Sequence, residues 1–307
     1  MFPSRMMLCV GALPDFDAVK HEVAWLARQF HAALIIYHAR FPRWRDLELL
    51  REERADEEAL ALESILEDPT LRALEVEIEC GDPPLNLVDE IMAEAERRDV
   101  DLLVMPTHKR QGLDRLVLGS LTERAIRSCR LPVVALDLAG LRGGGDDPQV
   151  DRVVVPVDFS RPAEAAAGFA LIVAEKLGCP MTLLYVVEEH FVPGGPEPTL
   201  ADIAGVKPQV VDEFRADLDR MIHRISGTSS VEVTGQVVVG RLLDGVRQSL
   251  QGADNPLVVM ATAGRDSIGD HVLGSRAERI LRSIPGSILT LPAGFLAAKT
   301  SGGGLRA

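Results

Sequence analysis

Residues Met105–Leu136 read MPTHKRQGLDRLVLGSLTERAIRSCRLPVVAL, and residues Met260–Leu291 read MATAGRDSIGDHVLGSRAERILRSIPGSILTL. Both segments contain Leu-Gly-Ser, then Glu-Arg, then Arg-Ser, and the shared residues keep one constant offset. Chance does not preserve such a register over about thirty residues, and internal repeats of this kind decide an architecture. The chain is therefore predicted to contain two copies of one structural unit.

The size and charge of the chain agree with a duplication and limit its function. A length of 307 residues is enough for two domains of ~150 residues, each with its own core. With 47% hydrophobic and 26% charged residues, the composition is that of a globular protein. The net charge of −13 and the pI of about 5.0 argue against a protein that binds the phosphate backbone of nucleic acids.

The cysteines and the N-terminus indicate the compartment. The four cysteines form no C-x-x-C pair and lie in or beside apolar runs, as buried residues of a reducing compartment do. The apolar run near the N-terminus is too short to span a membrane and is not followed by a clear cleavage site. We therefore expect a cytoplasmic protein that binds neither membranes nor nucleic acids.

Glycine-rich stretches divide the chain into its predicted units. The sequence AGLRGGGDDPQ at Ala139–Gln149 is typical of a linker, and SGGG at Ser301–Gly304 is typical of a frayed terminus. We expect a first domain at 1–138, a linker at 139–150, a second domain at 151–292 and a flexible tail at 293–307.

Within each half, short apolar runs alternate with amphipathic stretches. Strands are expected at Met6–Val10, Leu34–Ala39, Leu74–Cys80, Leu102–Met105 and Val133–Leu136, and again at Arg152–Val157, Met181–Val187, Val231–Val239, Leu257–Ala261 and Ser287–Leu291. Helices are expected at Val19–Phe30, Leu47–Leu66, Asn86–Arg97 and Leu121–Ser128, and again at Ala163–Leu177, Val210–Ile225, Leu242–Leu250 and Ser275–Ser283.

This alternation predicts an α/β protein with two doubly wound, five-stranded parallel sheets in tandem, in the flavodoxin-like strand order. Several strands are continuously apolar, as expected where helices cover both faces of a sheet. Ligands of such sheets bind beyond the carboxyl ends of the strands, where the strand order reverses. The repeated Gly-Ser segment follows the fourth strand of each half, so it falls where a ligand would bind.

The loop that ends at Gly274-Ser275 has two interpretations. Glycines allow successive backbone N–H groups to point at one anion, and the N-terminus of a helix adds unpaired donors and a positive dipole end. Gly264 and Gly274, with nine residues between them, are then a phosphate cradle. Alternatively, Ser275-x-x-Glu278 and Ser120-x-x-Glu123 are capping boxes that only start a helix.

The sequence resembles the universal stress protein family, whose nucleotide-binding members carry Gly-x2-Gly-x9-Gly-[Ser/Thr] at this place. The resemblance extends over nearly the whole chain, twice, and implies the α/β fold of the adenine nucleotide alpha hydrolase-like proteins. It rests on the segments VPVDFS at Val155–Ser160, LLYV at Leu183–Val186, GDPP at Gly81–Pro84, DLLVM at Asp101–Met105 and the following Thr107-His108.

For the second half, the resemblance implies a site for ATP or AMP, bound with or without Mg²⁺. Asp158 takes the place of the aspartate that holds the ribose, and Val186 that of the backbone that contacts adenine. The phosphate cradle falls on Ala261 at the first motif glycine, Gly264 at the second, and then Gly274 and Ser275, with the backbone N–H of Arg276.

The first half departs from the family pattern. Pro106 and Lys109 stand at the first two glycine positions, and only Gly119 and Ser120 are kept. Proline has no N–H to donate, and Gly11 stands where the second half has Asp158. Either Lys109 holds phosphates by its charge, with Gly119 and Ser120, or the first half has lost nucleotide binding and is a structural partner.

Three functions follow in order of support. The first is an ATP- or AMP-responsive stress protein that uses mainly the second half and acts on a protein partner that the sequence does not name. The second is a scaffold without nucleotide, which the departures at Gly11, Pro106, Lys109 and Ala261 favour. The third is a slow ATPase, although no nucleophile, general base, P-loop or metal-ligand spacing is present in the sequence.

The resemblance also implies how the two copies assemble. In the family, such units often pair through their fifth strands, here Val133–Leu136 and Ser287–Leu291. That pairing forms a pseudo-dimer within one chain and buries two strand edges that are otherwise prone to aggregate. Further dimerisation of the whole chain is an additional expectation.

Overall fold

The computed structural model describes residues 3–10, 13–39, 62–81, 86–107, 119–137, 149–188, 208–263 and 273–301. Its strands are β1 (Arg5–Val10), β2 (Ala33–Ala39), β3 (Val76–Gly81), β4 (Leu102–Thr107), β5 (Val133–Asp137), β6 (Arg152–Pro156), β7 (Met181–Val187), β8 (Val233–Val239), β9 (Pro256–Ala261) and β10 (Ser287–Leu291). Its helices are α1 (Leu13–Phe30), the 3₁₀ turn η2 (Pro69–Leu71), α3 (Leu87–Arg97), α4 (Ser120–Ser128), α5 (Arg161–Leu177), α7 (Pro208–Ser226), α8 (Leu242–Ser249), α9 (Ser275–Ser283) and α10 (Ala293–Ser301).

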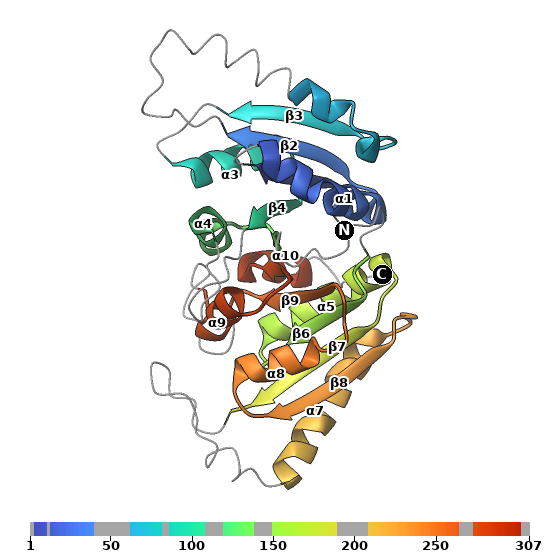
Figure 1. Cartoon of the computed structure of the whole chain (residues 1–307). Coiled ribbons are helices and arrows are strands. Elements are labelled where there is room, and N and C mark those ends of the chain that lie inside the picture. Colours follow the sequence, from blue (N-terminus) through green and yellow to red (C-terminus); the bar gives the residue numbers. More distant parts are fainter. Residues whose placement is uncertain are drawn as a thin grey trace.

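The strands form one sheet in the order β3-β2-β1-β4-β5-β10-β9-β6-β7-β8, visible in Figure 1 as a continuous stack from β3 to β8. Each half has the doubly wound order that the sequence predicts, with all neighbours inside a half parallel. The strand order reverses between β1 and β4 in the first half and between β6 and β9 in the second.

The two predicted sheets are joined at β5 and β10. These strands pair antiparallel, with Ile288 opposite Ala135 and Leu289 opposite Val134. The hydroxyl of Thr290 donates to the carbonyl of Val133 (3.1 Å), which satisfies a buried polar group inside the seam. The predicted pairing of the fifth strands is therefore confirmed, and the molecule has one ten-stranded sheet.

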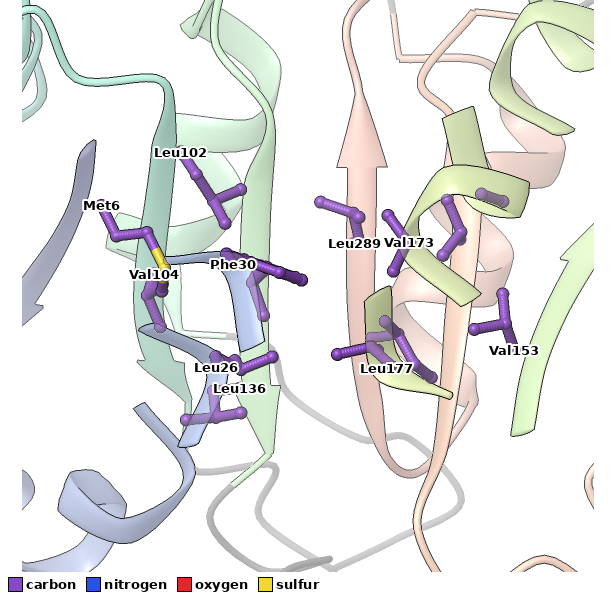
Figure 2. Packing of buried hydrophobic residues seen from close by; sticks show 14 of the residues in the cluster. Met6, Leu26, Phe30, Leu102, Val104, Leu136, Val153, Val173, Leu177 and Leu289 are labelled. Carbon is purple, nitrogen blue, oxygen red and sulfur yellow. The ribbon is translucent and has the colours of Figure 1, made fainter. Parts of the chain in front are cut away.

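Helices cover both faces of this sheet because successive side chains of each strand point to opposite sides. Met6 and Leu8 pack in a core shared with α1, α5, α7 and α10, whereas Met7 packs in a second core shared with α3, α4, α8 and α9. Figure 2 shows the first of these cores at the seam, where Phe30 of α1 and Val173 of α5 lie over the same face of the sheet, one from each half.

Most predicted elements are present within a few residues of their expected ends, with two differences. The helix expected at Leu47–Leu66 lies outside the described residues except for a helical turn at 62–66. The flexible tail predicted from residue 293 is wrong for Ala293–Ser301, which form α10. Leu296 is buried, and the Phe295 ring lies 5.6 Å from Phe169 of α5, so this segment docks on the core.

Local sequence explains where α5 begins and ends. The hydroxyl of Ser160 accepts the backbone N–H of Ala163 (3.3 Å) as an N-cap, and Gly178 ends the helix in the left-handed region (φ 66°).

All four cysteines are free thiols. Within the part of the chain that the structure describes, no helix is both long and apolar enough to cross a membrane.

Candidate functional site

A pocket opens at the reversal of strand order in the second half, beyond the carboxyl ends of β6 and β9. Its cavity volume is about 70 Å³, less than the ~300–1,000 Å³ that small-molecule sites usually occupy. Six residues that the sequence predicts for the site line it together, namely Asp158, Val186, Ala261, Gly274, Ser275 and Arg276. They come from the ends of three strands and the start of one helix, far apart in the sequence.

Asp158 is held in place by its own turn. Its Oδ1 accepts the backbone N–H of Ser160 at 3.0 Å, which fixes the carboxylate between the end of β6 and the start of α5. The carboxylate is half-buried and lines the pocket. This Asx turn is the structural role that an aspartate at a strand end often has, and it is compatible with a carboxylate that also faces a ligand.

Phe159, which lies between Asp158 and Ser160 in the chain, has a positive φ of 58°. This conformation costs a non-glycine residue about 1 kcal/mol or more. The Phe159 ring lies 4.6 Å from the Tyr185 ring and is stacked 6.2 Å from the Phe214 ring. Packing on the other face of the sheet thus stabilises the backbone that aims Asp158 at the pocket.

Gly274 does not have the role that the sequence predicts for its amide. Its N–H donates to the carbonyl of Thr262 at 2.8 Å, so this donor is already used inside the protein. The prediction of an anion-binding Gly274 amide is therefore wrong, because the bond anchors the loop to the end of β9. What remains of the cradle is the first turn of α9, which begins at Ser275; helix geometry gives the amides of a first turn no acceptor inside the helix itself.

The capping-box interpretation is also wrong in both halves. The N-caps of α9 and α4 are Gly274 and Gly119, and neither helix has a side-chain cap hydrogen bond. Ser275 is the first helical residue rather than the cap, and the Glu278 side chain pairs with Arg127 and Arg282 instead. The first turn of α9 therefore presents amides and the Ser275 hydroxyl at the pocket without a capping carboxylate.

Glu188 also belongs to this region, although it is not among the residues predicted from the sequence. It follows β7 directly, and its side chain is fully enclosed (0% exposed). It accepts the backbone N–H of Leu242 at 3.0 Å and forms ion pairs with Arg276 (3.5 Å) and Arg279 (3.4 Å). A charged residue at the end of a largely apolar strand was the sequence signal that could have indicated it.

The corresponding place in the first half contains a large side chain. Tyr37 is 2% exposed, and a Cβ added at Gly81 would lie only 1.9 Å from its hydroxyl oxygen. In the second half the strand register places Leu184 at the same position. Of the weaker candidates, Gly119 donates its N–H to the Thr107 hydroxyl at 3.4 Å and Ser120 begins α4.

Some predicted positions fall outside the described residues. These are Gly264, Lys109, Gly11 and His108. Among the described residues, no group of three or more histidine, cysteine, aspartate or glutamate side chains is arranged to hold a metal ion.

The fold and the pocket define a doubly wound α/β protein built from two tandem copies, with a small-molecule pocket at the strand-order reversal of the second. A family model described as the universal stress protein family matches residues 4–137 and again residues 149–292. The chain belongs to this family and contains two of its domains in tandem.

Three individual proteins illustrate what the chain is similar to. A universal stress protein of Methanocaldococcus jannaschii is 42% identical over 48 residues, which are 16% of this chain and 28% of that protein. The crystal structure of a universal stress protein from Archaeoglobus fulgidus covers 94% of this chain and 98% of its own, with a TM-score of 0.67 and 19% identity. A universal stress protein crystallised in complex with cAMP covers 47% of this chain and 98% of its own, with a TM-score of 0.35 and 20% identity.

Proposed function

We propose that the second half of the chain binds an adenine nucleotide, ATP or AMP, and that the bound form is recognised by a protein partner in a stress response. The observation that carries this proposal is the convergence of Asp158, Val186, Ser275 and Arg276 on one pocket. Each residue type suits one part of the ligand, and together they leave one orientation for it.

The ribose and the base are assigned to the strand ends. Asp158 is a carboxylate in a half-buried position, which suits two sugar hydroxyls. The backbone at Val186 supplies a donor and an acceptor for the edge of adenine, and the apolar walls formed by Leu184, Leu242 and Ile280 suit the base.

The phosphates are assigned to the first turn of α9. Backbone amides at a helix N-terminus together with the helix dipole bind anions, and the Ser275 hydroxyl adds a donor. The Arg276 side chain, which also pairs with Glu188 (3.5 Å), lines the same pocket and carries a charge of the sign that a phosphate requires. A ligand bound there orders this wall and can shift the population of the chain toward a partner-competent form.

Calorimetric titration of the full chain with ATP and AMP, with and without Mg²⁺, tests the proposal. Asp158→Asn keeps an oxygen for the Ser160 N–H but removes the charge, and should weaken binding at least tenfold. Asp244→Asn, on the exposed side of α8, is the matched control and should bind as the unmodified chain does. Absence of heat and of thermal stabilisation at millimolar ATP rejects the proposal, and cAMP is the ligand to compare.

The scaffold without nucleotide is the second candidate, and two observations favour it. Tyr37 occupies the first-half counterpart of the pocket, and the Gly274 amide is already bonded to Thr262. Purified protein that carries nucleotide from the cell excludes this candidate, whereas protein that neither carries nor binds nucleotide supports it.

A further inference from the structure

A second cavity lies at the seam between the two halves, over the strand pair in which Val134 is opposite Leu289. Its volume is about 30 Å³, room for roughly two or three water-sized groups at ~10–15 Å³ each. It shares no lining residue with the pocket of the second half, so it is a separate site. Residues of both halves form its walls, among them Leu26, Phe30 and Leu136 of the first and Val173 and Leu289 of the second (Figure 2).

Glu22 of α1 is the one charged residue among the described residues that line this seam cavity. It begins a run of buried residues from 22 to 27 and is itself only 9% exposed. Residues three and four positions apart share one face of a helix, and Trp25 and Leu26 line the cavity with it. A carboxylate therefore stands in the middle of the apolar face that α1 turns toward the seam.

The duplication shows that packing does not require a carboxylate at this position. The offset that places Phe30, the last residue of α1, on Leu177, the last residue of α5, places Glu22 on Phe169. Phe169 is buried and lines the same cavity from the other half. One copy of the repeat thus fills the seam with an aromatic ring, whereas the other places a carboxylate there.

The Glu22 carboxylate has no cation beside it in the part of the chain that the structure describes. Its carboxyl group interacts with its own backbone N–H and with the charge of His21, and no ion pair reaches it. Burial has the largest effect on this carboxyl and raises its pKa. Enclosing a carboxylate without a paired cation costs free energy, so a cationic guest beside Glu22 is favoured.

The other polar groups of the cavity also suit a hydrogen-bond donor. The Asn255 Nδ2 group donates to the carbonyl of Gln149 (3.1 Å), which leaves its Oδ1 as an acceptor. The Ser287 hydroxyl oxygen accepts the N–H of Asp137 (3.3 Å) and has a second lone pair. No lysine, arginine or histidine is among the described residues that line the cavity. An ammonium group, with three donors and no acceptor, matches this lining better than an anion does.

We propose that the seam cavity binds a small primary alkylamine, with its ammonium group against the Glu22 carboxylate and its alkyl chain between the apolar walls of the two halves. The cavity volume admits the ammonium group and the first carbons of the chain. The carboxylate supplies the charge, and walls such as Trp25 and Val173 supply the apolar contact. The guest touches both halves of the chain, and it does not depend on the proposed nucleotide site.

The experiment titrates the full chain with n-butylamine, n-butanol and butyrate, in a Trp44→Phe background. Trp25, which lines the cavity, is then the only tryptophan, and its fluorescence reports occupancy. The amine should bind at least tenfold more tightly than the alcohol, and butyrate should not bind. Glu22→Gln keeps the size of the side chain but removes its charge. It should lower the affinity for the amine at least tenfold and leave that for the alcohol within twofold.

Two variants control for indirect effects. Glu164→Gln removes a carboxylate that pairs with Arg224 at the protein surface, and it should change none of these affinities. Glu22→Phe introduces the residue that the second half has at the equivalent position, Phe169. The ring should fill the cavity and abolish binding of both the amine and the alcohol.

The comparison of amine with alcohol needs no change at Glu22, so it tests the inference even where a Glu22 variant does not fold. Equal affinities for the two, no fluorescence change with the amine, or an amine affinity that Glu22→Gln leaves unchanged each overturn the inference. N-acetyl-lysine amide carries the same ammonium group on a peptide backbone and should bind at least tenfold more weakly than n-butylamine. Tighter binding of this compound would make a protein side chain the guest and would overturn the assignment to a free amine.

Discussion

Arg127 of α4 lies 3.0 Å from Glu278 of α9, and this contact crosses the boundary between the two halves. The equivalent contact in the opposite direction is present as well, since Arg282 of α9 lies 2.5 Å from Glu123 of α4. The four residues are the Glu and the second Arg of the repeated motif, one pair from each copy. The motif that reveals the duplication therefore also builds a ring of ion pairs over the β5–β10 seam.

This ring should stabilise the folded chain only modestly. Its contribution should be measurable as a coupling free energy between two paired residues. We expect Arg127→Gln and Glu278→Gln each to destabilise the chain slightly, with a coupling free energy of about 0.5 kcal/mol in a double-mutant cycle. The value stays small because both side chains are 36% exposed. Urea unfolding at low and high salt measures it, and the coupling should decrease at high salt. A cycle between Arg127 and the distant Glu164 should give no coupling; coupling of equal size there would contradict the assignment.

Asp68 should make the stability of the first half depend on pH. Its Oδ2 lies 2.8 Å from Lys20 Nζ, which ties η2 to α1. Burial opposes ionisation of the carboxyl, but hydrogen bonds from Lys20 and Thr70 outweigh it and lower the pKa of Asp68 to about 2. Because the folded pKa is below the unfolded value, this contribution is complete above the unfolded pKa and is lost as pH falls through the folded one.

We therefore expect Asp68→Asn to lower the free energy of unfolding by about 1–2 kcal/mol near pH 7, and by roughly half as much at pH 3. The Asn side chain still offers an oxygen to the Thr70 N–H, so mainly the charge is tested. Asp17→Asn is the control, because Asp17 also pairs with Lys20 but is 73% exposed. A difference between Asp68→Asn and the unmodified chain that stays constant from pH 7 to pH 3 would refute the linkage.

The fold could be predicted because its determinants are periodic. Continuous apolar strands such as Met181–Val187 and amphipathic helices such as Ser275–Ser283 carry their structure in the residue pattern itself. The pairing of β5 with β10, which joins the two halves, was predicted from the family resemblance and not from the pattern of apolar residues. The helix at Ala293–Ser301 was missed because its packing depends on where Phe169 of α5 lies, which no local pattern encodes.

The site could be predicted only as a set of residues, without its hydrogen bonds. Asp158, Val186 and Ser275 do meet at one pocket. The destination of the Gly274 amide depends on the Thr262 carbonyl twelve residues earlier in the chain, and the partners of Glu188 come from α8 and α9. Such contacts are set by tertiary geometry, so motif spacing cannot supply them.

The hydroxyl of Tyr37 should be dispensable. It is buried, and among the described residues it has no hydrogen-bond partner that meets ordinary geometry. Burial, and then the charge of Glu90, raise the pKa of Tyr37 above its usual value, so the phenol stays neutral. We expect Tyr37→Phe to be neutral or to stabilise the chain by up to about 1 kcal/mol, since an unsatisfied buried hydroxyl is removed. A loss of more than 1 kcal/mol in urea unfolding would show that the hydroxyl is bonded.

Gly245 should be required for the shape of the proposed adenine contact. A Cβ at this position of α8 would lie 2.7 Å from Cγ2 of Val186 and 3.4 Å from its Cγ1. Val186 is buried and β-branched, so it has little freedom to rotate away. We expect Gly245→Ala to destabilise the chain by about 1–2 kcal/mol despite the better helix propensity of alanine, because overpacking outweighs it. Nucleotide affinity should fall with it, since the backbone of Val186 must shift.

Two further variants separate the steric overlap with Val186 from the change in helix propensity between glycine and alanine. Gly294→Ala in α10 meets no atom within 4 Å, so it should be neutral or stabilising by up to about 1 kcal/mol. The double variant Gly245→Ala with Val186→Ala removes both methyl groups that clash, so it should be more stable than the sum of the two single changes predicts. Additive losses in urea unfolding would mean that Gly245 is needed for another reason and that Val186 does not depend on it.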